Sequence, residues 1–501
     1  MEISSCFCTS FLAVILVLLL LKSLIVKPRN QKRKLPPGPW KLPIIGSIHH
    51  LVGALPHRRL KDLARLHGPL FHLKLGQVDY VIASSPAAAH EILKTHDVAF
   101  ASRPALMAIK TIAYNCSGMG FSPYGPYWRQ LRRVCAMELL NNRRVKTFAP
   151  IRREEAAQLV KKVGDLGGQS PVNLAEVFLE LTNNHLTRAA FGKECRSRGR
   201  FLMAMKETIR LAPVVSPMDL FPSMGFVIGL LDGSMREMKR LHGEIDTVLD
   251  EIISDHRAKK VAGGEEEEED LVDVLLRIQA NGELEIPLQM LHIKAVILDM
   301  LVAATETTAS TLNWVMTELV RNPHAMEKCR EETRRVLHGK NIEESDMEEL
   351  HYLKQVIKET LRLHPPLPLL LPRTCNKDVE MMGYTVPSKS RVMVNAWAIG
   401  RDSGMWAEPE RFMPERFENG GVDFKGGSFE YIPFGAGRRM CPGMAFAMAG
   451  MELFLAILLL NFDWKIPEGK GPDELDVEEE FDGALRRKND LCLLALPSLA
   501  M

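Results

Sequence analysis

A single cysteine, Cys441, stands where a thiolate would be stabilised. It lies in "FGAGRRMCPGMAFAMAG", behind Arg438 and Arg439 and just before an apolar run from residue 444 that predicts a helix. Free N–H groups and the helix dipole favour an anion at such an N-terminus, and the two arginines add positive charge. A lone cysteine is usually a buried, inert thiol, whereas this setting favours a thiolate. A nucleophilic thiolate needs a base, and neither histidine nor acid lies near it in sequence, but a single thiolate can ligate a haem iron.

A second group of reactive side chains lies inside a long apolar segment, residues 287–322. The segment predicts a helix that begins at Pro287 and runs through the core for about 50 Å. Its middle, "AATETT", places Glu306 and Thr307 after two alanines. Small residues let a flat ligand approach, and an acid and a hydroxyl can handle protons. Ordinary helix packing, with Thr307 bonded to a carbonyl one turn earlier, explains this segment equally well.

The stretch "FGAGRRMCPG" resembles the cysteine-ligand loop of the cytochrome P-450 family. Five positions match the family pattern, namely Phe434, Gly437, Arg439, Cys441 and Gly443. The resemblance implies that the protein binds haem b with its iron ligated by Cys441. Glycines in the loop would let the backbone approach the ligand closely.

Other motifs of the same family follow in order along the chain. "KETLR" and "FMPERF" resemble the Glu–Arg–Arg triad behind the haem, here Glu359, Arg362 and Arg416. "YWRQLRRVC" and "LLLPRT" are similar to segments that hold the haem propionates. This implies the propionate-binding residues Trp128, Arg132, Arg373 and Arg439. Arginine suits that role because its planar fork binds a carboxylate bidentately; core packing is the alternative for Trp128.

The resemblance also gives "AATETT" a role. Thr307 would steady the oxygen molecule and Glu306 would relay protons, although Ala304 stands where the family usually has glycine. The pocket is expected to be apolar and lined by residues 104–121, 205–225, 367–371 and 482–484 together with the central helix. The individual pocket residues expected are Leu298, Leu301, Ala303, Ala304, Leu369 and Ala484.

"LPPGPWKLPIIG", "FASRP" and "PYWRQLRR" resemble the land-plant microsomal group of this family, used in specialised metabolism. The resemblance implies a haem-thiolate monooxygenase that inserts one oxygen atom of O₂ into an apolar small molecule. Electrons would come from NADPH through NADPH–cytochrome P-450 reductase, with cytochrome b5 as a second candidate partner. Arg129 and Arg133 are predicted to face outward and to dock the reductase, unless they are merely solvated.

A terpenoid substrate is favoured, and a phenolic or flavonoid compound is the alternative. Two other classes of function remain. An oxygen-independent haem-thiolate isomerase or dehydratase would not need Glu306 and Thr307, and a haem sensor or scaffold would need no catalytic residues. The balance of 64 basic and 62 acidic side chains argues against nucleic-acid binding.

The elements that position these residues begin with an apolar N-terminus. Residues 1–26 are predicted to be a transmembrane anchor, and basic residues after it predict a single pass in the endoplasmic reticulum membrane with the catalytic domain facing the cytosol. A cleaved signal peptide is the alternative. Residues 27–43 are predicted to form a basic, proline-rich linker, and residues 44–501 the haem-binding catalytic domain. Nine cysteines without zinc spacing fit a reducing compartment.

The fold class expected is mainly α with a small β-rich lobe, the cytochrome P-450 fold behind a transmembrane helix. Residues 70–84 predict a hairpin around Gly76-Gln77, and 263–270, "GGEEEEED", predict a solvated loop. Besides 287–322, helices are expected around residues 124–142, 150–163, 239–258, 345–364 and 443–460.

Overall fold

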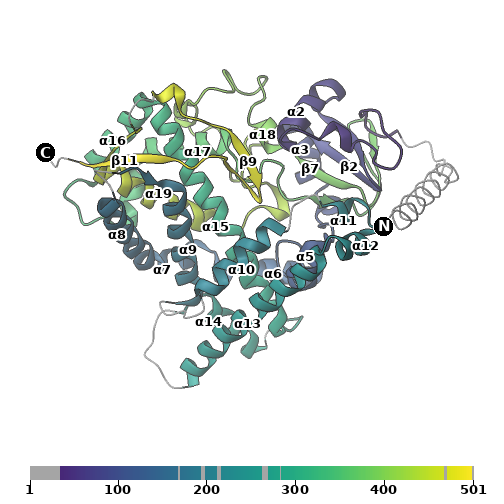
Figure 1. Cartoon of the computed structure of the whole chain (residues 1–501), viewed down its shortest axis with the longest axis horizontal. Helices are drawn as coiled ribbons and strands as arrows, with labels where there is room; N and C mark the ends of the chain where they lie inside the picture. The colour runs from purple at the N-terminus through teal and green to yellow at the C-terminus, as the bar shows by residue number, and fades with distance from the viewer. Residues whose placement is uncertain are drawn as a thin grey trace, which may run out of the picture.

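The fold is mainly helical with a small sheet-rich lobe at one end, as the sequence predicted (Figure 1). The computed structural model describes residues 34–166, 170–192, 198–211, 216–261, 269–282, 284–467 and 471–498. The predicted anchor and the first part of the predicted linker lie outside these residues, so the division into anchor, linker and catalytic domain stays a prediction.

The sheet-rich lobe is built on the predicted hairpin. Strands β1 (Leu70–Leu75) and β2 (Val78–Ala83) pair antiparallel around Gly76, whose φ of +58° suits glycine. β2 pairs parallel with β7 (Arg391–Val394), and β4 (Arg373–Thr374) completes the sheet in the order β1-β2-β7-β4. The smaller sheets contain β3 (Val172–Asn173), β11 (Cys492–Pro497) and β8 (Phe462–Lys465), then β9 (Glu479–Asp482) with β10 (Ala484–Arg487), and β5 (Val379–Met381) with β6 (Tyr384–Val386).

The central helix, α15 (Met290–Arg321), runs through the core as predicted but begins later than Pro287. Gln289 is its N-cap, and the Gln289 N–H bonds to His292 Nδ1 at 3.1 Å, so the helical turn starts after the proline rather than at it. α15 packs against α9 (Leu174–Phe191), α17 (His351–Leu363) and α19 (Met444–Asn461).

The remaining predicted helices are present with some changes. The region 124–142 is divided into α6 (Pro126–Val134), a π-helical turn (Cys135–Leu139) and α7 (Asn142–Thr147). Residues 150–163 lie in α8 (Ala149–Leu166), and 239–258 lie in α13 (Ser234–Val261). The other α-helices are α2 (Pro56–His67), α3 (Pro86–His90), α4 (Asp97–Phe100), α5 (Met107–Ile112), α10 (Arg198–Leu211), α11 (Pro217–Leu220), α12 (Gly225–Leu231), α14 (Leu271–Asn281), α16 (Pro323–Leu337) and α18 (Ala396–Ile399).

Two helices in the described part of the chain, α15 and α19, are long and apolar enough to cross a membrane. In both, most of the apolar stretch is buried inside the protein, so they are core helices by position. α19 buries Phe454 and Leu458 against α16 and α17, and α15 buries Trp314 and Leu319. These contacts give the site its rigid frame.

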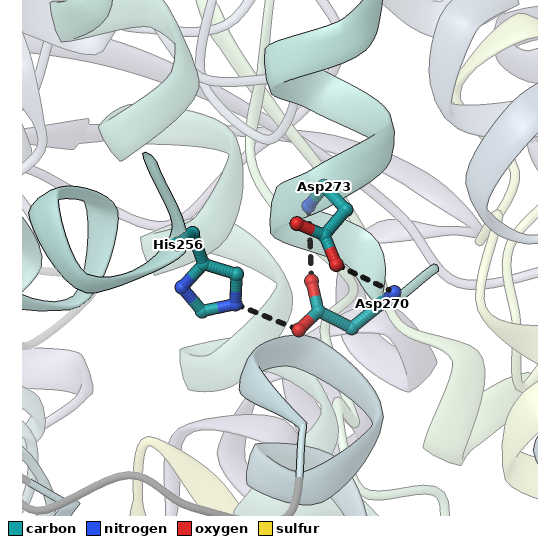
Figure 2. Close-up of side chains that lie close together, drawn as sticks. All are labelled: His256, Asp270 and Asp273. Atoms are coloured by element: carbon teal, nitrogen blue, oxygen red, sulfur yellow. Dashed lines mark hydrogen bonds and ion pairs between the residues drawn. The ribbon is translucent and has the colours of Figure 1, made fainter. Parts of the chain in front are cut away.

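Of the described residues of the predicted solvated loop 263–270, namely Glu269 and Asp270, Asp270 is not solvated. Asp270 is buried, caps α14 by accepting the Asp273 N–H at 2.9 Å, and lies 2.7 Å from His256 Nε2 (Figure 2). The prediction is wrong for Asp270 because the last acid of the charge run is the N-cap of α14. Residues 263–268 lie outside the described residues.

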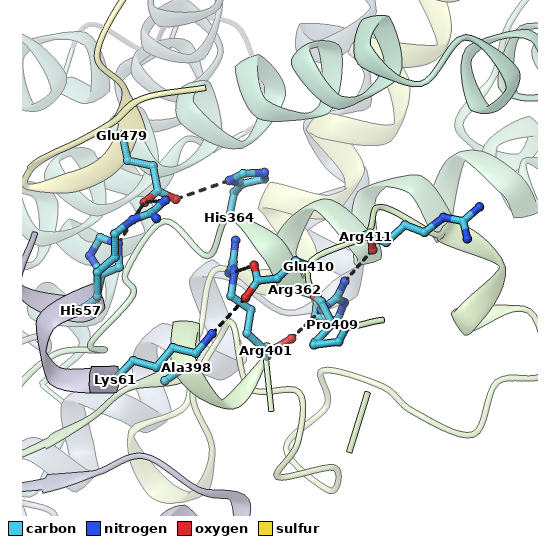
Figure 3. A network of polar contacts seen from close by, with 12 residues as sticks. His57, Lys61, Arg362, His364, Ala398, Arg401, Pro409, Glu410, Arg411 and Glu479 are labelled. Carbon is cyan, nitrogen blue, oxygen red and sulfur yellow. Dashed lines mark hydrogen bonds and ion pairs between the residues drawn. The ribbon is translucent and has the colours of Figure 1, made fainter. Parts of the chain in front are cut away.

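A buried polar network fixes the β9–β10 hairpin to the rest of the molecule (Figure 3). Glu479 of β9 bonds to His57 at 3.1 Å and to Arg58 at 2.7 Å, both on α2. On the next strand, the Leu485 carbonyl accepts hydrogen bonds from Ser310 Oγ at 2.6 Å and Trp314 Nε1 at 3.2 Å, both on α15. The hairpin therefore has a fixed position beside the central helix.

Candidate active site

The Cys441 loop is a closed turn that leads into α19. The Cys441 N–H donates to the Phe434 carbonyl at 2.9 Å, and a short 3₁₀ turn (Gly437–Arg439) lies between them. Gly437 has a φ of +69°, and a Cβ there would lie 2.1 Å from the carbonyl oxygen of Leu93. The protein's own backbone therefore requires a glycine at this position, and its approach to a ligand stays a prediction. A Cβ on Gly443, in contrast, would meet nothing within 4 Å.

The Cys441 thiol faces an opening inside the protein. Its side chain is exposed, yet burial raises its pKa, and an internal opening accounts for both observations. The Gly443 N–H and the Arg132 guanidinium act in the opposite direction and lower this pKa. Arg132 is thus the cation that acts on the thiol, whereas Arg438 pairs with Asp97 at 3.4 Å. The protein alone does not make Cys441 a thiolate, but a coordinated metal ion would deprotonate it.

Three buried arginines give the site an excess of positive charge. Arg103, Arg373 and Arg439 are each at most 9% exposed. Burial and the neighbouring cations Arg373 and Arg132 lower the pKa of Arg439 to about 9. Asp97 pairs with Arg373 at 3.2 Å, while Arg103 and Arg439 bond to backbone carbonyls. Buried cations of this kind fit a ligand that carries carboxylates, as haem does.

The structure places the other predicted propionate ligands beside these arginines. Trp128 Nε1 donates to the Met119 carbonyl at 3.0 Å, and the Arg439 guanidinium lies 4.0 Å above the Trp128 ring. Trp128 is also buried, which fits the core-packing alternative, and its role beside the propionates stays a prediction. Arg103 was missed from the sequence, although "FASRP" contained a signal: a lone arginine directly before a proline and close to the apolar Phe100 and Ala101.

The middle of α15 presents small and polar residues to an interior opening. Ala303 is exposed on a helix whose flanking turns are buried, and Ala304, Glu306 and Thr307 are half-buried. Thr307 Oγ1 donates to the Ala303 carbonyl at 2.6 Å. The hydroxyl therefore makes the expected packing bond and still lies at the surface of the opening. Like Ala303, Cys441 is exposed, and a Cβ on Gly443 would meet nothing within 4 Å, which leaves room for a ligand at these residues.

The predicted triad is assembled behind the Cys441 loop. Arg362 donates two hydrogen bonds to the Glu359 carboxylate, both at 2.7 Å, and Arg416 Nε donates one at 3.2 Å. The Glu359 and Arg362 side chains are fully buried. Arg362 also bonds to the carbonyls of Gly400 and Pro409, which ties α17 to the segment before the Cys441 loop (Figure 3).

Most of the predicted pocket residues are buried in the core. Leu298 and Leu301 are buried in a core cluster with α6 and α13, and Leu369 packs with the β1–β2 hairpin. Ala484 is buried on β10, and only Ala303 and Ala304 expose surface toward the opening. The lining role of these residues stays a prediction.

The site has the parts that a haem protein needs, and comparison with known proteins decides the family. The cytochrome P-450 family model matches residues 36–492. The chain belongs to the cytochrome P-450 family. It is a haem-thiolate protein by family and an oxidoreductase of the monooxygenase class.

Plant members of the family are similar over nearly the whole chain. Desmethyl-deoxy-podophyllotoxin synthase of Sinopodophyllum hexandrum is 47% identical, covering 99% of this chain and 97% of the relative. Premnaspirodiene oxygenase of Hyoscyamus muticus is 47% identical, covering 93% and 94%. Among solved structures, a zebra fish cytochrome P-450 with progesterone aligns with a TM-score of 0.76 at 24% identity, covering 89% of this chain and 100% of that chain, which confirms the fold.

Proposed function

We propose that this cytochrome P-450 hydroxylates a terpenoid, with Cys441 as the haem ligand. The observation that carries the haem assignment is the exposed Cys441 thiol just before α19, a helix that packs against α15, on which Ala303 is also exposed. Relatives named premnaspirodiene oxygenase and 5-epiaristolochene 1,3-dihydroxylase, the latter 45% identical, support a terpenoid. The relative named desmethyl-deoxy-podophyllotoxin synthase keeps a phenolic compound as the second candidate.

Haem, when bound, supplies the activation of O₂, and the chain's own side chains do the rest. Arg103, Arg373 and Arg439 would bind its carboxylates, which would relieve their mutual repulsion. Thr307 Oγ1, now donating to the Ala303 carbonyl, can rotate to donate a proton toward the opening. Glu306 precedes Thr307 and is also half-buried, and it would pass protons from solvent to replace the one that Thr307 donates.

The first test is the absorption spectrum of the reduced, carbon monoxide-bound protein in membranes. The wild-type protein should give a strongly red-shifted Soret band, which Cys441→Ser should abolish. Cys492→Ser is the matched control because Cys492 is also free and exposed, and it should keep the band. A band typical of histidine-ligated haem in the wild type would contradict the assignment.

Electron delivery is proposed to use the exposed face of α6. Arg129 and Arg133 are exposed, one step around the helix from Trp128 and Arg132, and Arg129 lies over the Tyr124 ring at 5.9 Å. Reversing both charges should slow turnover with NADPH–cytochrome P-450 reductase and weaken its dependence on salt. Arg153→Glu, an exposed arginine on α8, is the control. Unchanged turnover would mean that these arginines are only solvated. The same variants, assayed with cytochrome b5, test whether it binds the same face.

Membrane attachment at one face is supported by two exposed apolar segments that meet. The Gly76 N–H donates to the Ile45 carbonyl at 3.1 Å, and the Gln77 N–H donates to the Leu220 carbonyl at 2.8 Å. This places the start of the described chain beside α11 and α12. The exposed apolar residues there are Leu35, Trp40, Leu42, Ile45, Val52, Met224, Phe226, Val227, Leu230 and Leu231. With the predicted anchor, they would hold the protein on the cytosolic face of the endoplasmic reticulum.

Protease protection tests this orientation. Protease added to sealed microsomes should digest the catalytic domain, and protection of that domain would contradict the cytosolic topology.

A further inference from the structure

A short backbone segment, residues 118–122, is held from two opposite directions. From one side, the Asp299 carboxylate of α15 accepts the Gly120 N–H at 2.7 Å and also the Met119 N–H. From the other side, the Met119 carbonyl accepts hydrogen bonds from Trp128 Nε1 and Arg439 Nη1, both at 3.0 Å. The same peptide groups therefore connect the central helix to two residues of the proposed haem site.

The contact between Asp299 and this segment is close enough to require a glycine. A Cβ on Gly118 would lie 2.2 Å from Asp299 Oδ2, so the carboxylate occupies the volume that any other side chain would need. A Cβ on Gly120 would lie 3.5 Å from the same oxygen, which is an ordinary contact. Gly118 therefore gives the carboxylate its access to the backbone.

The backbone just before this segment is strained. Tyr114, Asn115 and Cys116 have φ values of 47°, 55° and 60°, three consecutive non-glycine residues in the left-handed region. Each such residue costs on the order of 1 kcal/mol or more and persists only where other contacts fix it. Tyr114 donates its hydroxyl hydrogen to Asp246 of α13 at 2.9 Å, which fixes one end, and Asp299 fixes the other.

Asp299 lies two turns before Glu306 on α15, so the two acids share one face of the helix. Burial raises the pKa of Asp299 to about 6, while the N–H groups of Gly120 and Met119 and the Arg439 guanidinium lower it. The hydrogen bonds that the buried Asp299 carboxylate accepts from the backbone favour its ionised form.

We propose that Asp299 is a positioning residue of the active site. Its carboxylate sets the position of residues 118–122, and the Met119 and Gly120 carbonyls in turn orient Arg439, Trp128 and Arg103. The inference rests on the proposed haem-binding role of these side chains. Because the segment belongs to the predicted pocket loop 104–121, its displacement would also alter the position in which a substrate is held.

Amide hydrogen exchange of the full-length protein in membranes tests the contact directly. Asp299→Asn should speed exchange of the Met119 and Gly120 amides at least tenfold. The asparagine oxygen is a weaker acceptor than a carboxylate, and its NH₂ group would face the backbone N–H groups. Gly118→Ala should give the same increase by displacing the carboxylate. Gly125→Ala is the matched control: its Cβ meets nothing within 4 Å and its φ of −177° is open to any residue, so exchange at 119 and 120 should not change.

A second readout separates positioning from general destabilisation. The rate at which bound haem passes to excess apomyoglobin should rise for Asp299→Asn and Gly118→Ala, while the midpoint of thermal unfolding changes far less than for a core variant. Exchange at Met119 and Gly120 that is unchanged in both variants would overturn the proposal. Equal loosening by Gly125→Ala would also overturn it. A wild-type protein without thiolate-ligated haem would overturn the proposed function. The exchange experiment would still decide whether Asp299 holds residues 119 and 120.

Discussion

The two sides of the Cys441 loop are held in different ways. Behind the loop, the fully buried Glu359 carboxylate accepts hydrogen bonds from Arg362, Arg416 and the Met413 N–H. In front of it, α15 presents exposed Ala303 and half-buried Thr307 beside the strained segment 114–116. The rear side buries its polar groups in internal hydrogen bonds, and the front side leaves Ala303 exposed and Thr307 half-buried.

The difference separates stability from chemistry. A buried ion pair tolerates no loss of a partner, because the remaining charge cannot be solvated. A helix face beside an opening tolerates changes in its side chains, but each change alters what the opening can bind or protonate. Variants behind the loop should therefore unfold the protein, whereas variants in front should leave it folded with altered function.

The largest effect should come from Glu359→Gln. The change leaves the Arg362 guanidinium buried without its counter-charge, and we expect a loss of about 3–5 kcal/mol in the free energy of unfolding. Denaturant unfolding would measure it. Glu415→Gln is the control, because Glu415 is 38% exposed and pairs with exposed Lys328, and it should cost less than about 1 kcal/mol. Equal effects of the two variants would contradict a locked rear side.

Two glycines of the Cys441 loop allow the same change, glycine to alanine, to be made where the protein's backbone requires glycine and where space is open. Gly437→Ala should destabilise the protein by about 1–3 kcal/mol even without haem, because its φ is +69° and its Cβ meets the Leu93 carbonyl oxygen. Gly443→Ala should leave the free energy of unfolding of the haem-free protein unchanged and lower haem content instead. Unfolding curves and haem absorbance per polypeptide distinguish the two results, and a drop in stability for Gly443→Ala would remove the contrast.

On the front side, Thr307→Val should have a small structural effect. The variant loses the hydrogen bond from Thr307 Oγ1 to the Ala303 carbonyl, at a cost of about 1 kcal/mol or less. The hydroxylated product should nevertheless fall more than tenfold while NADPH is still consumed, because the proton-donating hydroxyl is gone. Product formed per NADPH oxidised is the measurement, and Thr311→Val, one turn further along α15, is the control. An unchanged ratio would restrict Thr307 to packing.

The rear side was predictable from the sequence, while much of the front side was not. Glu359, Arg362 and Arg416 occur in short motifs that resemble the family's triad, and the structure brings the three side chains into contact. Arg103 and Asp299 depend on backbone carbonyls and N–H groups contributed by residues 118–122. No pattern of side chains specifies where a loop's peptide groups will point. The start of α15 was misplaced for a similar reason, since the cap at Gln289 uses local bonds rather than the proline signal.

The smallest effect should come from a contact remote from the loop, where pH sets the strength of one hydrogen-bonded pair (Figure 2). Burial lowers the pKa of His256, but its bond to Asp270 and the charges of Asp270 and Asp273 outweigh burial and raise it above the ordinary value. A raised folded-state pKa stabilises the protein below the unfolded value of about 6.5, and this stability is lost as pH rises through the folded-state value. Burial and Asp270 also raise the pKa of Asp273.

We therefore expect unfolding to become easier by about 1 kcal/mol or less between about pH 6 and about pH 8, and His256→Gln to remove that part of the dependence. Thermal unfolding at the two pH values measures it, and His324→Gln, at the start of α16, is the control. The shift in stability should appear in wild type and Thr307→Val alike. The His256–Asp270 pair joins α13 to the N-cap of α14 and involves neither Thr307 nor Cys441. A shift confined to one of them would show that the front side is coupled to α13 and α14, and the division between a locked rear and an open front would then need to include these helices.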